Sequence, residues 1–241
     1  MKRTAWIVIA AVGWIIAAGI VARPWITLRH VRPITVKGYA EQEVTSDSAS
    51  LTAVVMATGP TAAEAYQGAG RALTRCRDVI AEALGARATM VELGTTVEDV
   101  PKVNEQGKKM NEVDYYIAHR RLRVDSSDVQ SMERLGRALN DLNAEGIRVN
   151  VVGPDFFISN AALEQVKLNL IKAATEDAHV RAQTMAQGSG ARVGRLVSAR
   201  QGVFQITKRN SSETSDYGIY DTETIQKIVR VTVTLEYEVA R

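Results

Sequence analysis

The stretch Val-Arg-Val-Thr-Val-Thr-Leu-Glu-Tyr-Glu-Val at positions 229–239 is the clearest β-strand pattern in this chain. Apolar residues occupy every second position, and the residues between them are polar or charged. Because successive side chains of a strand point to opposite faces, the alternation predicts a strand with one buried and one solvated face. Strands of this kind are typical of an antiparallel or mixed sheet that is covered by helices on one side.

Further strands are predicted upstream of this one. Their apolar patterns place them at 34–44, in a run after Asp47, and at 87–99, 115–124, 147–152 with a continuation at 156–159, and 193–206. Two polar segments, 101–113 and 208–224, predict loops, and the second is either a mobile tip or a long hairpin loop.

The first long helix is predicted to begin with a capping box. The Thr61 hydroxyl is placed to accept the Glu64 amide, and the Glu64 carboxylate is placed to reach back. Gly85 predicts the end of this helix, and Gly68 and Gly70 inside it favour a close approach to a sheet. The predicted buried stripe recurs every three or four residues and contains Tyr66, Ala69, Leu73, Cys76, Ile80 and Leu84.

Two more helices follow. The second is predicted to be capped by Ser127, with Gln130 in the capping-box position, and to end at Gly146. The third begins at Asn160 and ends near 188–190. The predicted buried residues are Val129, Met132, Leu135, Leu139 and Leu142 in the second helix, and Leu163, Val166, Leu170, Ala174, Ala178 and Met185 in the third.

The resulting order is β-β-α-β-β-α-β-α-β-β, in which hairpins are joined by helices. This order predicts an α+β domain over 34–241, with helices packed on a mixed or antiparallel sheet. The patterns at the two ends of the domain are also consistent with two lobes that share one sheet.

Residues 5–22 form an uninterrupted run of eighteen apolar or small residues. A helix of this length spans about 27 Å, close to the roughly 30 Å of a bilayer core. We therefore expect residues 1–24 to be a membrane anchor, with a short stalk at 25–33. Its expected lipid-facing, interfacial or helix-contact residues are Trp6, Ile9, Gly13, Trp14, Ala17 and Trp25.

A cleaved signal peptide is the alternative, although the apolar run is longer than such peptides usually carry. The basic residues that flank the run are nearly balanced, so they do not fix its orientation. A short leader before a long soluble body favours a single-pass protein whose body lies in the periplasm or outside the cell. Cleavage would instead leave a periplasmic protein.

Composition excludes some functions. The formal net charge of +3 argues against a nucleic-acid binder with a broad basic face. Cys76 is the single cysteine, so no internal disulfide forms, and its place on a helical apolar stripe predicts a buried thiol. His30, His119 and His179 are not spaced as metal ligands, and His179 is expected to form a solvated pair with Glu176. The sequence predicts no catalytic residue, metal or cofactor, although a triad assembled from distant residues stays open.

The densest basic cluster of the chain contains His119, Arg120, Arg121 and Arg123. One interpretation is a contact with another subunit, with anionic lipid head groups or with nucleic acid. The other is a solvated outer sheet face that is neutralised by Glu236 and Glu238 on a nearby strand. In both interpretations His119, Arg121 and Arg123 share one strand face.

Several segments together resemble the SIMPL-domain family. They are residues 34–41, 44–47, the alanine-rich stretch 177–198 and the closing strand at 231–239, and the resemblance covers about 33–240. It implies a bacterial envelope protein, periplasmic or membrane-associated, with no established catalytic activity. Some relatives are recognised as envelope antigens or stress-associated proteins, and ring-like or channel-like homo-oligomers occur in the family.

The sequence thus leads to a membrane-anchored, non-enzymatic envelope protein that self-associates. Its expected partners are membrane lipid and further copies of itself, without nucleic acid. The alternative is a monomeric binding module that captures a small ligand or another protein through 101–113 and 208–224. The identity of any small-molecule ligand stays open.

Overall fold

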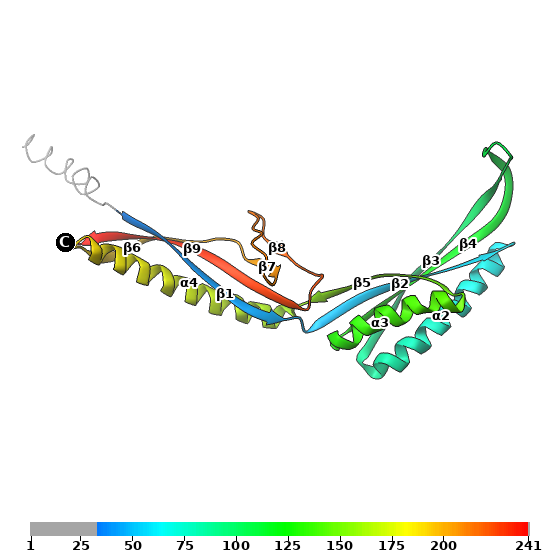
Figure 1. Cartoon of the computed structure of the whole chain (residues 1–241), viewed down its shortest axis with the longest axis horizontal. Coiled ribbons are helices and arrows are strands. Elements are labelled where there is room, and N and C mark those ends of the chain that lie inside the picture. Colours follow the sequence, from blue (N-terminus) through cyan, green and yellow to red (C-terminus); the bar gives the residue numbers. More distant parts are fainter. Residues whose placement is uncertain (1–32, 241) are drawn as a thin grey trace, which may run out of the picture. The chain divides into compact units, whose positions relative to one another are not determined.

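The computed structural model describes residues 33–240 (Figure 1). The expected anchor and almost all of the stalk lie outside the described residues, including Trp6, Ile9, Gly13, Trp14, Ala17 and Trp25. No helix in the described range is both long and apolar enough to span a bilayer. The helices are α2 (Ala62–Leu84), α3 (Val129–Asp141) and α4 (Asn160–Gly188). The strands are β1 (Pro33–Thr45), β2 (Ser48–Gly59), β3 (Ala88–Val103), β4 (Lys109–Ser126), β5 (Arg148–Phe157), β6 (Arg192–Gln201), β7 (Gln205–Lys208), β8 (Ile219–Tyr220) and β9 (Gln226–Ala240).

The strands form two sheets, which confirms an α+β fold but not the single sheet expected from the sequence. One sheet has the order β1-β9-β7-β8, with β6 also paired to β9, and it is mixed because β7 and β8 are parallel. The other has the order β3-β4-β2-β5 and is antiparallel throughout. The chain changes sheets at Ser46 and Asp47, between β1 and β2, where the Asp47 carboxylate accepts the Ser159 amide at 2.7 Å.

The described chain divides into two compact units. The terminal unit contains the described residues up to Ala40, residues 169–203 and the residues from Arg230 onward. The central unit contains residues 41–168 and 204–229. Neither unit is one continuous stretch of sequence, because β1, α4 and β9 contribute residues to both.

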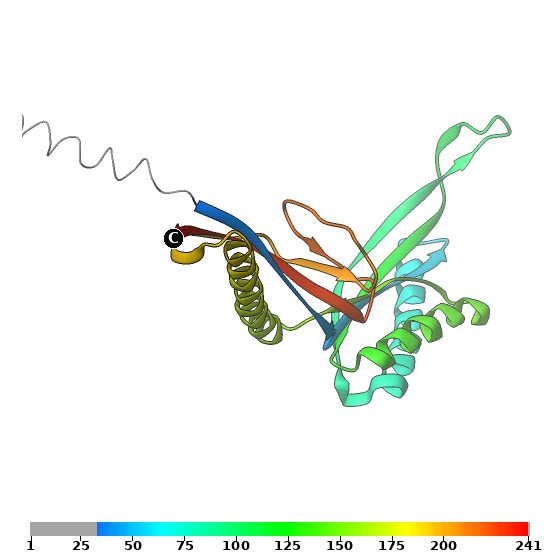
Figure 2. The ribbon, with the colours of Figure 1, turned by 60° about the vertical axis from the view of Figure 1, so that its left-hand side comes forward.

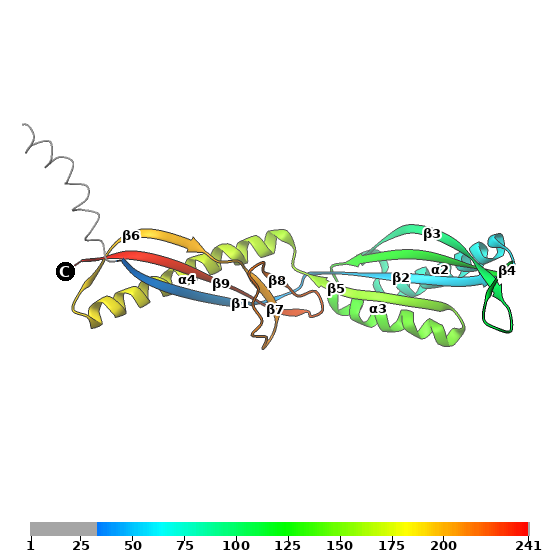
Figure 3. The same cartoon turned by 90° about the horizontal axis from the view of Figure 1, so that it is seen from above.

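The central unit is built around β2-α2-β3-β4-α3-β5. This order, with sheet order β3-β4-β2-β5, is the ferredoxin-like, split βαβ arrangement. Helices α2 and α3 lie on the same face of the sheet (Figures 1 and 3). Between them and the sheet lies a core of aliphatic side chains that includes Leu51, Val55, Leu73, Ile80, Leu122, Leu135 and Leu139.

Helix α2 confirms most of its prediction. The Thr61 hydroxyl accepts the Glu64 amide at 3.2 Å, and Gly85 ends the helix with φ +55°. The prediction that Tyr66 is a core residue is wrong, because its side chain is 48% exposed and Ala65 is buried instead. A Cβ at Gly68 would lie 3.1 Å from the Cβ of Ala57 in β2, so this glycine allows the predicted close approach. All the other predicted stripe residues are buried.

Helix α3 is capped one residue later than predicted. Asp128, rather than Ser127, is the N-cap, and its carboxylate accepts the Ser131 amide at 3.1 Å. The Ser126 hydroxyl accepts the Asp128 amide at 3.0 Å. A 3₁₀ turn, Leu142–Glu145, follows the helix and ends at Gly146 with φ +83°, where the sequence predicted the end. The five predicted core residues of this segment are buried.

Small residues determine the packing of α4 in the terminal unit. Every fourth residue on its buried face is alanine, at positions 174, 178, 182 and 186. A Cβ at Gly38 of β1 would lie 2.6 Å from the Ala178 amide nitrogen and closer still to the Ala174 carbonyl oxygen. Only glycine therefore lets β1 pass this close to α4. Met185 is wrong as a core residue because it is 55% exposed.

Strand β9 confirms the alternation from which the fold was predicted. Five residues of the pattern are buried, namely Val229, Val231, Val233, Leu235 and Tyr237. The last member, Val239, is exposed near the end of the strand. The predicted strand at 193–206 is interrupted at 202–204, which separates β6 from β7.

Candidate functional site

The four-stranded sheet has one face opposite α2 and α3 that no described element of the central unit covers. Along β2, β4 and β5 its side chains alternate with buried or half-buried residues, and the strand register brings them together with those of β3. We call this surface the open face. It contains Ser50, Thr52, Val54 and Met56 of β2, Ile117, His119, Arg121, Arg123 and Asp125 of β4, Arg148, Asn150 and Val152 of β5, and Thr89, Val91 and Thr96 of β3.

The basic cluster predicted on β4 divides between the two faces of this sheet. His119, Arg121 and Arg123 lie on the open face, as the alternation predicted. Arg123 donates from Nε to the Asp125 carboxylate at 3.0 Å, whereas Arg121 is exposed. Arg120 lies on the helix side, so the four residues do not form one continuous surface.

Arg120 is held by a partner that the sequence did not indicate. Its Nε donates to Glu92 of β3 at 3.1 Å, and its guanidinium lies 5.2 Å from the centre of the Tyr66 ring. Arg77 of α2 binds the second oxygen of the same carboxylate at 2.9 Å. The predicted neutralisation by β9 carboxylates is wrong at Glu238, which pairs with Arg195 at 2.7 Å.

The segment predicted as a loop at 101–113 is a β-hairpin. Strands β3 and β4 pair as far as Val103 and Lys109, and Asn104 closes the turn by accepting the Gln106 and Lys108 amides. The part of β4 that precedes Tyr116 does not pair with β2, so residues 100–115 form a two-stranded arm (Figure 2). Its exposed apolar residues are Val103, Met110 and Val113, with 64%, 43% and 40% of their surfaces accessible.

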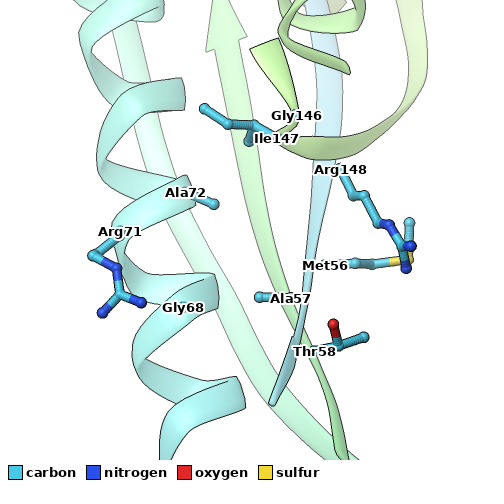
Figure 4. Close-up of a pocket in the computed structure, with 9 residues that line it drawn as sticks. All are labelled: Met56, Ala57, Thr58, Gly68, Arg71, Ala72, Gly146, Ile147 and Arg148. Carbon is cyan, nitrogen blue, oxygen red and sulfur yellow. The ribbon is translucent and has the colours of Figure 1, made fainter. Parts of the chain in front are cut away.

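A cavity of about 390 Å³ lies between α2, β2 and the start of β5 (Figure 4). Ala57, Ala72 and Ile147 form its apolar floor, and Figure 4 shows Arg71 and Arg148 on opposite sides of that floor. Neither arginine forms an ion pair with any residue in the described range. Because the two guanidinium groups do not converge, this cavity is not a site for one small anion.

A second hollow, of about 560 Å³, lies at the edge of the sheet where β2 and β3 begin and β4 and β5 end. Five hydroxyl-bearing residues line it, and we call it the hydroxyl hollow. Its residues are Ser48, Ala49, Ser50, Arg87, Thr89, Arg123, Asp125, Ser126, Ser127 and Phe157. Sequence reasoning missed it because the contributing strand ends are up to 109 positions apart, and Ser127 was interpreted as a helix cap.

Lys227 is a fully buried lysine in the central unit. Its ammonium donates to the Asp221 carboxylate at 3.3 Å and to the Thr224 carbonyl oxygen. Burial lowers the pKa of Lys227 despite the neighbouring carboxylate. Burial also opposes ionisation of Asp221, but hydrogen bonds from Thr224 and Glu223 and the charge of Lys227 outweigh it, so the pKa of Asp221 is lowered. This pair holds the segment before β9 in place.

The remaining reactive side chains are also engaged. His179 contacts the Tyr237 hydroxyl at 3.3 Å and the Gln183 amide at 2.9 Å, so its predicted pairing with Glu176 is wrong. Cys76 is buried as predicted, and burial raises the pKa of its thiol to about 11. Within residues 33–240, no three His, Cys, Asp or Glu side chains gather as a metal site would require. His30 lies outside the described residues.

The fold and these surfaces define a protein with two α+β units, an open sheet face and a projecting hairpin. The chain belongs to the SIMPL family, described as a protein of unknown function (DUF541), whose model matches residues 34–237. The resemblance seen in the sequence is therefore confirmed. No curated protein matches this chain.

Solved structures give weak similarities only. A hydantoinase/carbamoylase family amidase from Burkholderia ambifaria shares 14% identity, with a TM-score of 0.33, over 56% of this chain and 34% of the amidase. The Burkholderia vietnamiensis amidase of that family shares 12% identity, with a TM-score of 0.30, over 56% of this chain and 33% of the other. An uncharacterised conserved protein from Listeria innocua shares 10% identity, with a TM-score of 0.22, over 80% and 91% of the two chains. This chain spans about a third of the length of the amidases, and these scores carry no argument about its activity.

Proposed function

We propose that this protein is a non-catalytic scaffold of the bacterial envelope. An N-terminal helix anchors it in the inner membrane, and its periplasmic body associates with further copies of itself. The apolar run at residues 5–22 supports the anchor. The engagement of Arg120, Lys227 and His179 in internal contacts supports a structural rather than a catalytic role for these side chains.

The hairpin arm, residues 100–115, is the observation that carries the self-association. A two-stranded hairpin is marginally stable by itself in water, and this one also exposes three apolar side chains. Unpaired strand edges next to exposed apolar residues favour pairing with another chain. A second polypeptide that covers the arm would therefore stabilise it.

A second copy of this chain suits the arm because the arm carries both signs of charge. Lys102 and Glu112 form an ion pair at 3.0 Å, and Lys108, Lys109, Glu105 and Asp114 flank them. In a two-fold contact the same patch must complement itself, which a mixture of acidic and basic residues allows. Tethering to one membrane raises the effective concentration, so weak lateral contacts suffice.

The mass of the full chain in mild detergent tests the self-association. We expect a discrete assembly, and we expect the double substitution Val103→Ser/Val113→Ser to raise its dissociation concentration about tenfold or more. Val180→Ser is the matched control because Val180 is an exposed valine on α4, outside the arm. A monomeric wild type at micromolar concentrations contradicts the proposal, as does an equal effect of the control.

Deletion of residues 1–24 tests the anchor. The truncated protein is expected in the soluble fraction, and persistent membrane association would mean that the body itself binds lipid. Labelling of the purified protein by a panel of serine- and cysteine-directed active-site probes would contradict the non-catalytic part of the proposal.

The monomeric binding module remains the second candidate because of the segment 208–224. The Gln205 amide holds this segment by donating to the Ser215 carbonyl at 2.6 Å, and two residues further on Tyr217 is 98% exposed. A fully exposed tyrosine on a braced loop is suited to contact a partner. Two results together would favour this candidate over the scaffold. The wild-type protein would be a monomer, and the substitution Tyr217→Ser would abolish its binding to a partner.

A further inference from the structure

The hydroxyl hollow of the central unit brings hydrogen-bonding groups from neighbouring strands into one row. The register places Ser50 of β2 and Thr89 of β3 on either side of Asp125 in β4. Neighbouring strands are about 4.8 Å apart, so the two hydroxyls flank the carboxylate at a spacing that a sugar ring can bridge. Among the described residues, the hydroxyls of Ser50, Thr89 and Ser127 have no protein partner.

The charges of the hollow are already balanced. Arg123 pairs with Asp125 at 3.0 Å, and Arg87 pairs with Asp128. Each guanidinium has five N–H donors and each carboxylate has several acceptor positions, so these pairs keep donors and acceptors for a ligand. A site with no net charge does not favour an ion, but it does favour a ligand whose groups both donate and accept.

The hollow also has an apolar side. Phe157, at the end of β5, lines it next to the hydroxyl groups, and Phe157 is kept in place by a tilted contact with Tyr220, whose ring centre is 6.5 Å away. A sugar ring presents C–H groups on its faces and hydroxyl groups at its edge. An aromatic wall beside a row of polar groups matches both parts.

From these observations we infer that the hydroxyl hollow is a binding site for a neutral carbohydrate. Arg123 donates to the sugar hydroxyls, Asp125 accepts from them, and Ser50 and Thr89 complete the row. The inference is independent of self-association, because all these residues lie outside the hairpin arm.

The test uses the full chain in mild detergent on an array of neutral, sialylated and sulfated oligosaccharides. The expected result is binding to neutral members, followed by calorimetric titration of the best one. Ser50→Ala/Thr89→Val should weaken that binding about tenfold or more, because it removes two hydroxyl partners. Thr96→Val is the matched control: Thr96 is an equally exposed open-face threonine of β3, outside the hollow, and its substitution should change affinity less than twofold.

Two results would overturn the inference. One is an array on which no neutral oligosaccharide binds, including the case in which only charged ones do. The other is equal affinity of the double variant and Thr96→Val. Circular dichroism confirms that each variant keeps the wild-type fold. The assembly of the double variant in detergent should have the same number of copies as that of the wild type, and this result separates the carbohydrate test from the test of the scaffold.

Discussion

Substitution of Gly38 by alanine tests how closely β1 and α4 pack in the terminal unit. The new Cβ would lie 2.6 Å from the Ala178 amide nitrogen and 2.7 Å from the Ala178 Cβ. Ordinary carbon contacts are about 3.5–4 Å, and the Ala174 carbonyl oxygen lies closer still, so α4 and β1 must separate by more than about 1 Å. Overpacking typically costs about 1–3 kcal/mol, and we expect about 3 kcal/mol here because backbone atoms are hit.

Hydrogen–deuterium exchange is the suitable assay because it resolves the two units. A loss of about 3 kcal/mol should speed exchange of the buried α4 amides in residues 169–188 by about 150-fold. The α2 amides, in the central unit, should be unchanged. Gly188→Ala is the control, since a Cβ at Gly188 meets nothing within 4 Å and alanine favours helix. If Gly38→Ala changes α4 exchange by less than about threefold, the packing argument is wrong.

Three further predictions concern the central unit. Asp221→Asn leaves the buried Lys227 charge unpaired and should lower the free energy of unfolding in urea by about 3 kcal/mol. Because the pKa of Asp221 is lowered, its contribution is present above the ordinary aspartate pKa of about 3.9 and is lost as pH falls through the lowered value. Urea titrations in acid should show a steeper fall of the free energy of unfolding with pH in the wild type than in Asp221→Asn. Cys76, with its pKa raised to about 11, should have about one thousandth of its thiol ionised at pH 8, so Ellman's reagent should react only after unfolding. Thr61→Ala removes the α2 cap and should cost about 1 kcal/mol in the same urea titration, and an unchanged midpoint would show that the 3.2 Å hydrogen bond contributes nothing.

Local periodicity explains why much of the fold could be predicted. The alternation at 229–239 and the stripes of α2 and α3 report directly which side of each element is buried. Where the pattern misled, the predicted stripe was one position off at one end of a helix. Ala65 rather than Tyr66 is buried in α2, and Ala186 rather than Met185 is buried in α4.

The hairpin arm was missed because it buries neither face. At 101–113 both sides of each strand meet solvent, so no alternation marks the strands, and the backbone pairing is what defines them. The division into two sheets was missed for a similar reason. Two residues, Ser46 and Asp47, separate β1 from β2, and nothing in their sequence indicates which strands will pair.

The candidate site shows the same limit. Alternation placed His119, Arg121 and Arg123 on one face of β4, but it could not identify Glu92 as the partner of Arg120 from 28 positions away. The hydroxyl hollow depends on register between four strands, which single-sequence patterns do not carry.

The interleaving of the two units along the chain has a consequence for biosynthesis. The ribosome delivers the whole β2-to-β5 segment, residues 48–157, before it reaches β9, so this segment can fold while synthesis continues. The terminal unit is completed later, because its β9 residues are translated after those of β1 and α4. Until then, β1 lacks the neighbouring strand with which it pairs. The newly made protein therefore passes through an intermediate in which the edge of β1 is unpaired, and we expect chaperones to bind at this stage.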